Sequence, residues 1–406
     1  MKVLNIYTAY REKYRAELDE NVIAFWLKYG KDTEHGGVYT CLDKTGTLYC
    51  TDKSVWMQGR CAWMFSYLCG LYGYREDYHA FAKSCLAFLD AHCIDPQDGR
   101  MYFSVTGDGQ PLRKRRYFFS ETFYIIACAE YAAVFGDETY MEKARRYYDF
   151  VMRIYRDPGA DPYKITPKYQ PGVRPSKAFA EPMILLNVSH IMSRCDSANA
   201  AKYDAAAKEL TETILQLFYK PELKALLETT GPNGEFLRNA FGGRTMNPGH
   251  AIEGVWFLVT QANKTGDKAL LEKAENIYAW AMERGWDRTY GGMFAFVDVL
   301  GFPPEALEHD MKLWWPTCET IISSLMLFEA TGRQEYWDNF VKADSFAFSF
   351  FSDREGGGEW YGYLHRDATP TLPACKGNLF KGPFHVPRML SIAERCLARL
   401  EAKQAD

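Results

Sequence analysis

The sequence predicts an all-α protein in which six helical hairpins close into an (α/α)6 barrel, with short β-hairpins or loops gathered at one mouth. Three observations predict this architecture: a recurring helix–turn–helix phrase, a recurring type of helix start, and loops of similar composition before those starts. No Pro/Ser-rich linker or low-complexity tract divides the chain, so we expect residues 1–406 to form a single domain.

The recurring phrase joins the end of one helix to the start of the next. Its four clearest copies lie at residues 72–88, 135–150, 265–280 and 331–346. In each copy a Gly follows an apolar helix, and an acidic or polar residue precedes an aromatic-rich amphipathic helix. Gly is favoured just after a helix C-terminus and a carboxylate at a helix N-terminus, so each copy predicts the turn of a helical hairpin.

The helices that precede these turns share a signature start that recurs about every 60 to 70 residues. The starts lie at Trp56, Phe118, Ala178, Asn247, Trp314 and Phe380. Gly- and aromatic-rich stretches at 35–46, 95–109, 287–301 and 356–369 precede four of them and would leave the barrel at the same end. An open solenoid needs polar capping repeats, whereas the last predicted inner helix, Pro383 to Leu400, keeps an aromatic start, which favours closure.

Ionisable residues recur just inside the predicted helix starts. They are Arg60, Glu121, Glu181, His250, Glu319 and His385. Charged side chains are seldom fully buried without a partner, so this ring indicates either mutual pairing or a wet pocket, and we favour the pocket. The accompanying aromatic residues are Trp56, Phe118, Phe119, Trp314, Trp315, Phe380 and Phe384. Such a mixture suits a sugar, although a core position explains Phe118 and Phe384 equally well.

His250 follows Pro248 and Gly249 at the start of an apolar stretch, and Glu253 comes three residues later. Residues at i and i+3 share a helix face. The pair is therefore either a buried imidazole satisfied by a carboxylate or an oriented acid/base. Two histidines and two glutamates could also supply three metal ligands, which leaves a metal site as an alternative; we expect no metal.

Composition argues against several classes of function. The net charge of −4 and the pI near 6.1 do not suit nucleic acid or an anionic membrane. Eleven cysteines without a C-x-x-C pair, and an N-terminus without an apolar leader, predict free thiols in a cytoplasmic protein. No run of eighteen apolar residues occurs, nor any phosphate-binding loop, dinucleotide fingerprint, nucleophile elbow or H-E-x-x-H motif. The basic run at 113–116 is interpreted as a solvated loop.

The sequence resembles the N-acylglucosamine 2-epimerase family, whose relatives include cellobiose 2-epimerases and aldose–ketose isomerases. The resemblance covers essentially the whole chain. It rests on MQGR at 57–60, GGRTMNPGHAIEGVWF at 242–257, KLWWPTCET at 312–320, GGEWYGYL at 357–364 and KGPFH at 381–385. It implies an (α/α)6 barrel that interconverts N-acylglucosamine and N-acylmannosamine by removing and returning the proton at C2, with no required cofactor.

The resemblance also implies roles for the matching residues. The expected catalytic residues are His250, His385, Glu253 and Glu319. The expected substrate-binding residues are Arg60, Trp315, Trp314, Phe380, Glu121 and Lys177. The two histidines would face C2 from opposite sides, and the two glutamates would orient and tune them. The arginine would stabilise the oxygen that becomes negative, and Trp315 would stack on the sugar.

Two features of the sequence bear on which sugar is the substrate. The NPGH phrase at 247–250, and Phe380 where disaccharide epimerases tend to have Trp, point to a monosaccharide. The alternatives are an epimerase or aldose–ketose isomerase of another sugar, such as mannose, glucose, fructose or a cellobiose-like disaccharide, and a binding protein. A glycoside hydrolase that uses Glu253 and Glu319 is a further alternative. ATP stimulates some members of the family, and no nucleotide-binding motif in this sequence decides whether it acts here. A homodimer is left open.

Overall fold

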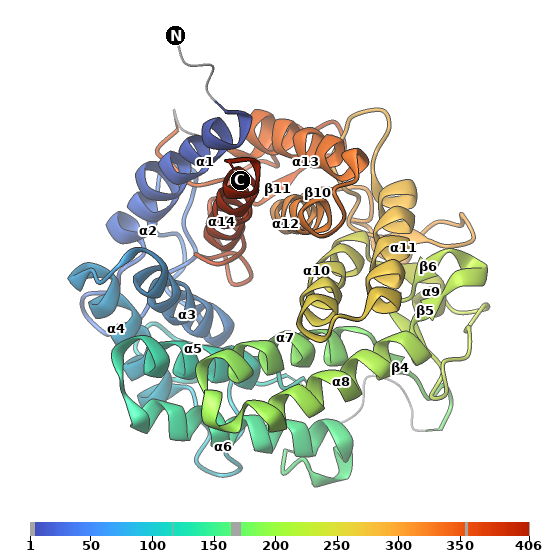
Figure 1. Ribbon diagram of the computed structural model, residues 1–406. Helices are drawn as coiled ribbons and strands as arrows, with labels where there is room; N and C mark the ends of the chain where they lie inside the picture. The colour runs from blue at the N-terminus through green and yellow to red at the C-terminus, as the bar shows by residue number, and fades with distance from the viewer. Residues whose placement is uncertain (1–4, 116, 164–171, 354–355, 406) are drawn as a thin grey trace.

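The computed structural model describes residues 5–115, 117–163, 172–353 and 356–405, and it confirms the predicted barrel (Figure 1). The inner ring consists of α3 (Val55–Tyr72), α5 (Phe119–Phe135), α7 (Ala180–Cys195), α10 (Pro248–Thr265), α12 (Trp314–Thr331) and α14 (His385–Ala405). The outer ring consists of α1 (Ile6–Ala16), which continues through the π-helical turn Glu17–Ile23 into α2 (Ala24–Tyr29), then α4 (Glu76–His92), α6 (Glu138–Arg156), α8 (Ala200–Leu217), α11 (Lys268–Gly285) and α13 (Gln334–Phe346).

The two ends of the chain close the ring, because the first outer helix packs against the last inner helix (Figure 1). The Thr8 hydroxyl donates to Glu401 Oε1 at 2.6 Å, and Arg11 Nε donates to Glu394 Oε1 at 3.3 Å. A closed ring leaves no apolar end face that needs a capping repeat, which is why the last inner helix can keep an aromatic start.

The predicted hairpin turns are present. Gly136, Gly266 and Gly332 follow α5, α10 and α12 in the left-handed conformation, at φ of 74°, 71° and 71°. The next helix starts from Asp137 or Asp267 in two of these turns, and the carboxylate accepts hydrogen bonds from backbone N–H groups of the first turn. These are the positions where Gly relieves strain and a carboxylate caps free N–H groups.

The loops at the mouth contain two kinds of short antiparallel pairing: local hairpins, as predicted, and ladders that join two different loops. Among the named strands of the described residues, β2 (Ser104–Val105) with β3 (Pro111–Arg113), and β5 (Tyr219–Lys220) with β6 (Ala225–Leu226), pair across short connections, and isolated bridges such as Leu42 with Leu48 close further local turns. The other ladders join segments from successive loops. They are β1 (Lys53–Ser54) with β2, β4 (Lys177–Ala178) with β7 (Thr229–Thr230), β8 (Thr245–Met246) with β9 (Val297–Asp298), and β10 (Lys312–Leu313) with β11 (Tyr363–Leu364). Most of these ladders fix the backbone just before an inner helix begins.

Buried ion pairs tie the outer helices to the inner helices at the mouth. Lys53 Nζ lies 2.6 Å from Asp32 Oδ2, and Lys312 Nζ lies 3.0 Å from Asp287 Oδ2. Each Asp follows an outer helix, and each Lys precedes the next inner helix. Both lysine side chains have no exposed surface. The pairs therefore hold the end of one hairpin against the start of the next.

The basic run at 113–116 is not simply a solvated loop. Lys114 Nζ lies 2.7 Å from Asp98 Oδ2 with only 8% of its side chain exposed, and the Arg115 guanidinium lies 3.8 Å from the centroid of the Phe103 ring. Arg116 lies outside the described residues. Lys114 and Arg115 depart from the interpretation, because Lys114 pairs with carboxylates of the preceding loop and Arg115 lies over an aromatic ring, whereas Arg113 is exposed in β3 as expected.

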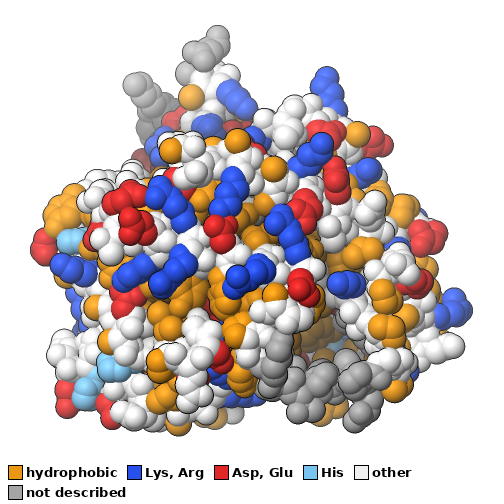
Figure 2. Space-filling model, turned by 90° about the horizontal axis from the view of Figure 1, so that it is seen from below, with side chains coloured by type: hydrophobic (Ala, Val, Ile, Leu, Met, Phe, Trp, Pro, Cys, Tyr) orange, Lys and Arg blue, Asp and Glu red, His pale blue; other side chains and the backbone are white. Residues whose placement is uncertain are grey.

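The outer wall carries interspersed charges of both signs, as Figure 2 shows for the side formed by α6 and α8. Arg156 of α6 and Glu209 of α8 form one exposed pair there, with Nε 3.1 Å from Oε1. Among the described residues, no helix combines the length and apolar character needed to cross a membrane.

Candidate active site

His385 is the first residue of α14, and its imidazole is held by a carboxylate from the neighbouring inner helix. Nδ1 lies 2.8 Å from Oε1 of Glu319 on α12, and Glu319 has no exposed surface. The other oxygen, Oε2, accepts a hydrogen bond from Trp256 Nε1 at 2.8 Å. We assign the Nδ1 proton to the bond with Glu319, which leaves Nε2 of His385 unprotonated in the neutral ring.

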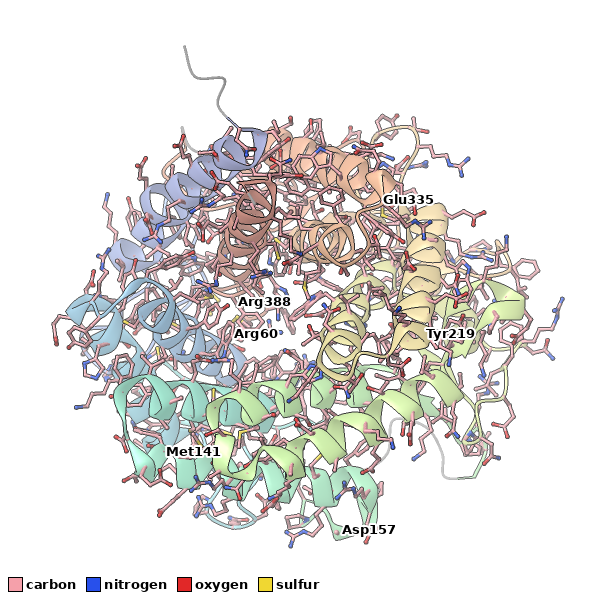
Figure 3. The ribbon with its side chains drawn as sticks, in the orientation of Figure 1. Arg60, Met141, Asp157, Tyr219, Glu335 and Arg388 are labelled. Carbon is pink, nitrogen blue, oxygen red and sulfur yellow. The ribbon has the colours of Figure 1, made fainter. Side chains whose placement is uncertain are left out.

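Arg388, one turn after His385, is a site residue that the sequence analysis missed. Its Nη2 donates to Glu253 Oε1 at 2.8 Å and to Glu319 Oε1 at 2.6 Å, and lies 3.2 Å from His385 Nδ1. The residue is only 2% exposed. Figure 3 shows Arg388 and Arg60 lying toward the centre of the ring. The spacing of three residues from His385 was the available signal, since it places both on one helix face.

This arrangement holds His385 in its neutral form. Burial is the largest cause, and the positive charges of Arg388 and Arg60 add to it, so the pKa of His385 falls well below its usual range. His385 can therefore accept a proton at neutral pH.

His250 is positioned by a helix cap and by a carboxylate from a mouth loop. Asn247 Oδ1 accepts a hydrogen bond from the His250 backbone N–H at 3.0 Å, and Pro248 occupies the first turn. His250 Nδ1 lies 3.0 Å from Oε1 and 3.1 Å from Oε2 of Glu228. Burial by itself lowers the pKa of His250, but the charge and hydrogen bond of Glu228 outweigh it and raise the pKa above its ordinary value.

The expectation that Glu253 orients and tunes His250 holds only in part: its charge helps to raise the pKa of His250, but it does not orient the ring. Glu253 shares the helix with His250, yet its carboxylate accepts from Arg388, and the Nδ1 partner of His250 is Glu228. A side chain at i+3 is close in sequence, but here the guanidinium of α14 provides the stronger partner. The expectation for Glu319 and His385 agrees with the geometry.

Trp315 lies against both histidines. Its ring centroid is 5.2 Å from that of His250 and 5.9 Å from that of His385. The absence of a side chain at Gly249 makes room for it, because a Cβ there would lie 2.6 Å from Trp315 Cη2. Residues far apart in sequence thus meet around a single indole, as the barrel predicted.

Arg60 lies near this group. The ring–ring contacts described for Phe380 are instead with Trp56 and Phe103, and Trp314 does not face solvent. The Arg60 guanidinium lies 4.7 Å from the centroid of the Phe384 ring, and burial lowers its pKa to about 9. Phe380 is 42% exposed and packs near Trp56 at 6.3 Å between ring centroids. Trp314 is only 3% exposed and packs against His385 with 6.2 Å between ring centroids, which favours a packing role; its direct contact with substrate stays a prediction.

Glu121 is not part of the site, contrary to the sequence-based expectation. It has no exposed surface, and its Oε1 accepts from Arg100 Nε at 2.6 Å and from the Met101 backbone N–H at 2.8 Å. Glu121 therefore anchors the loop before α5. Its partner Arg100 is also 1% exposed, so the pair is structural.

Lys177 and Glu181 lie at the start of α7, and no described contact joins either to the histidines. Lys177 is exposed in β4, where its backbone pairs with Thr230. Glu181 is half-buried, and burial raises its pKa while the charge of Lys177 opposes the shift. The aromatic residues Phe118 and Phe384 are 5% and 3% exposed, which agrees with a core position for Phe118, whereas Phe384 also lies against His385 with 5.1 Å between ring centroids.

The metal alternative has a definite location. Ligand atoms of Glu253, Glu319 and His385 lie within 4.8 Å of one another. Arg388 Nη2, however, contacts all three residues. A metal cation would therefore have to displace a guanidinium that already pairs with both carboxylates.

The two histidines make the same kind of contact, but their pKa values are shifted in opposite directions. In each ring a carboxylate binds Nδ1, and among the described residues neither Nε2 has a hydrogen-bond partner. The pKa is raised in His250 and lowered in His385. The surroundings thus favour the protonated form of His250 and the neutral form of His385 beside the same indole, an arrangement suited to general acid–base chemistry.

Comparison with known proteins identifies the family. The profile of the N-acylglucosamine 2-epimerase (GlcNAc 2-epimerase) family matches residues 37–381. The chain is 36% identical to the N-acylglucosamine 2-epimerase of Bos taurus, over 98% of this chain and 93% of that protein, and 35% identical to that of Homo sapiens, over 98% and 92%. The solved cellobiose 2-epimerase of Spirochaeta thermophila shares the fold, with a TM-score of 0.82, 20% identity, and coverage of 99% of this chain and 100% of that one. With its barrel and sequence in agreement, the chain belongs to the N-acylglucosamine 2-epimerase family.

Proposed function

We propose that this protein is a cofactor-independent sugar 2-epimerase that interconverts N-acylglucosamine and N-acylmannosamine. The observation that carries the proposal is the pair of imidazoles beside Trp315, each with its Nδ1 bound by a carboxylate and with pKa values displaced in opposite directions. The names and near-complete coverage of the mammalian relatives support the substrate class.

The reaction begins on the open-chain aldehyde form of the sugar. In one direction Nε2 of neutral His385 removes the C2 proton, and the C2–H electron pair moves into the carbonyl group to give an enolate. Protonated His250 then delivers its Nε2 proton to the opposite face of C2, and the aldehyde re-forms. The reverse reaction uses the same groups in exchanged roles, as microscopic reversibility requires.

Arg60 supplies the positive charge for the enolate oxygen. Its lowered pKa of about 9 still leaves the guanidinium charged at neutral pH, and burial strengthens its field. A fixed cation near a developing oxyanion typically contributes several kcal/mol, about 3 for one good donor.

Glycoside hydrolysis is disfavoured by the setting of the two glutamates. Both carboxylates accept from the same Arg388 nitrogen, and Glu253 and Glu319 are 8% and 0% exposed. A hydrolase needs one carboxylic acid that protonates a leaving oxygen and one carboxylate that reaches the sugar or its water. Buried carboxylates that are both held by one guanidinium meet neither requirement.

The test is deuterium incorporation at C2, followed by NMR after incubation of N-acetylmannosamine or N-acetylglucosamine in deuterated water. The wild type should convert each sugar to the other with deuterium at C2. His250→Gln and His385→Gln should both lose net epimerisation, while each still exchanges the C2 proton of one epimer, a different one in each variant. His35→Gln, at an exposed histidine, is the matched control and should behave as the wild type.

Three outcomes would contradict the proposal. Wild-type epimerisation by either active-site variant would remove the two-histidine mechanism. Exchange of both epimers by the same variant would indicate a single base. A ketose product from the wild type would indicate an aldose–ketose isomerase.

A further inference from the structure

A cavity of about 340 Å³ lies inside the ring, on the side of Arg388 away from the active-site histidines. All inner helices begin at the mouth, so residues late in these helices lie toward the opposite end. The lining includes such late residues, among them His190 and Arg194 of α7, Lys264 of α10 and Ile392 of α14. Arg388 lines the same cavity and points toward the ring centre (Figure 3). Its side chain thus separates two regions of the barrel.

Every permanently charged side chain that lines the cavity among the described residues is a cation. These are Arg194, Lys264 and Arg388. The carboxylates that pair with the first two, Glu130 and Asp204, are not part of the lining. Each of the three cations is paired with a carboxylate outside the lining, so of these pairs the wall presents only the positively charged members to the cavity.

Arg388 has unused hydrogen-bonding capacity. Its three described contacts with Glu253, Glu319 and His385 all involve Nη2. Nε is buried without a partner, and no described residue accepts a hydrogen bond from Nη1. A guanidinium has five N–H donors, and leaving charged donors unpaired inside a protein is costly. An acceptor in the cavity could pair with an N–H group of Arg388, on Nε or Nη1, that the glutamates do not use.

The remaining wall is largely aromatic. Trp63, Tyr67, Trp256 and Phe384 line the cavity, and Trp63 stacks on Tyr67 with 4.8 Å between ring centroids. The volume lies within the range of small-molecule sites. Aromatic walls bind the flat apolar body of a ligand, whereas a simple inorganic anion would leave them uncovered.

We infer that this cavity is a second binding site, distinct from the epimerase centre, for a small organic carboxylate with a planar apolar body. The carboxylate accepts from an N–H group of Arg388 that the glutamates do not use, the body packs against the aromatic rings, and Lys264 and Arg194 at the rim attract the anion. Because Arg388 also holds Glu319 and His385, an anion there offsets part of its positive charge and raises the pKa of His385 toward its ordinary value.

The test is direct binding of benzoate, measured by titration calorimetry and by quenching of tryptophan fluorescence, so that its result does not depend on the epimerase reaction. Benzyl alcohol serves as the uncharged probe of similar shape. Wild-type protein should bind benzoate saturably and bind benzyl alcohol at least tenfold more weakly, which corresponds to about 1.4 kcal/mol. Lys264→Met should weaken benzoate binding about fivefold, because it removes one partly exposed attractive charge.

Two further variants make the experiment decisive. Ile392→Trp fills the cavity and should abolish benzoate binding while a thermal unfolding curve shows that the protein is folded. Lys268→Met removes an exposed lysine of the adjoining helix, away from the lining, and should bind benzoate as the wild type does. The inference is overturned by absent saturation, by equal binding of benzyl alcohol, by unchanged binding in folded Ile392→Trp, or by equal weakening in Lys264→Met and Lys268→Met.

Discussion

Glu228 and His250 are joined by a carboxylate–imidazole contact in which Nδ1 lies 3.0 Å and 3.1 Å from the two carboxylate oxygens. Glu228 comes from the loop before β7, and His250 from the first turn of α10. The contact favours the imidazolium form, whereas the buried setting of His385 favours neutral imidazole. The proposed acid and base are therefore distinguished by their surroundings alone.

Glu228→Gln should shift the pH dependence of epimerisation. The folded-state pKa of His250 is raised, so the activity that needs protonated His250 is present at lower pH and is lost as the pH rises through that pKa. Removing the carboxylate charge lowers the pKa, and the alkaline limb of kcat/KM for that epimer should move to lower pH. Glu222→Gln, at an exposed glutamate of the same loop, is the control. An unshifted alkaline limb in Glu228→Gln would show that His250 does not set it.

Arg388→Lys should impair catalysis although it keeps the charge. A lysine ammonium cannot reproduce the fork that holds Glu253, Glu319 and the His385 ring in one geometry. We expect kcat/KM to fall on the order of 10²-fold, and the free energy of unfolding to fall by about 2–4 kcal/mol, because two buried carboxylates lose their partner.

Arg395→Lys makes the same substitution at an exposed position of α14, and it should change neither kcat/KM nor the free energy of unfolding. Steady-state kinetics and chemical denaturation measure both variants. Wild-type kcat/KM in Arg388→Lys would show that the guanidinium fork is not needed to position His385.

The repeating features of the fold could be predicted from sequence because they follow from local chemistry. Gly136 and Gly266 each adopt the left-handed conformation at the end of a helix, and the Asp that follows each of them caps the next helix. Equivalent positions on successive inner helices also brought His385 and Glu319 into contact. Periodicity succeeds where the same backbone geometry recurs in each hairpin.

Periodicity fails where a partner comes from a loop. Glu228 precedes its inner helix at no repeating position, so nothing in the sequence assigns it to His250. Glu121 does occupy a repeating position, yet Arg100 from the preceding loop draws its carboxylate away from the centre. Sequence spacing places a residue on a helix, while the partners of a buried charge are decided by tertiary contacts.

Gly249→Ala should disturb Trp315 more than it disturbs the fold. The new methyl group would lie 2.6 Å from Trp315 Cη2, too close for an unshifted indole, and Trp315 contacts both histidines. Helix propensity by itself favours Ala over Gly by up to about 1 kcal/mol, so stability should change little. A displacement of about 1 Å near the reacting groups should lower kcat/KM on the order of 10²-fold.

Gly242→Ala is the matched control, because its added methyl would meet only Thr229 Oγ1 at 3.9 Å. Kinetics and tryptophan fluorescence report the two effects separately. Unchanged kinetics in Gly249→Ala would mean that the indole can shift without moving either imidazole.

Lys53→Met should destabilise the protein strongly, while the double variant with Asp32→Asn should recover much of the loss. Lys53 Nζ bonds to Asp32 Oδ2 at 2.6 Å and to the carbonyl oxygens of Gly36 and Gly107 at 2.8 and 2.7 Å, with no exposed surface. Removing one partner leaves a buried charge alone and should cost about 3–5 kcal/mol, whereas removing both charges avoids that penalty. Arg156→Met, which breaks the exposed pair with Glu209, should cost less than about 1 kcal/mol. Chemical denaturation of the wild type, Lys53→Met, Asp32→Asn and the double variant completes the cycle, with Arg156→Met as the exposed control, and additive losses in the double variant would show that the buried pair is not coupled.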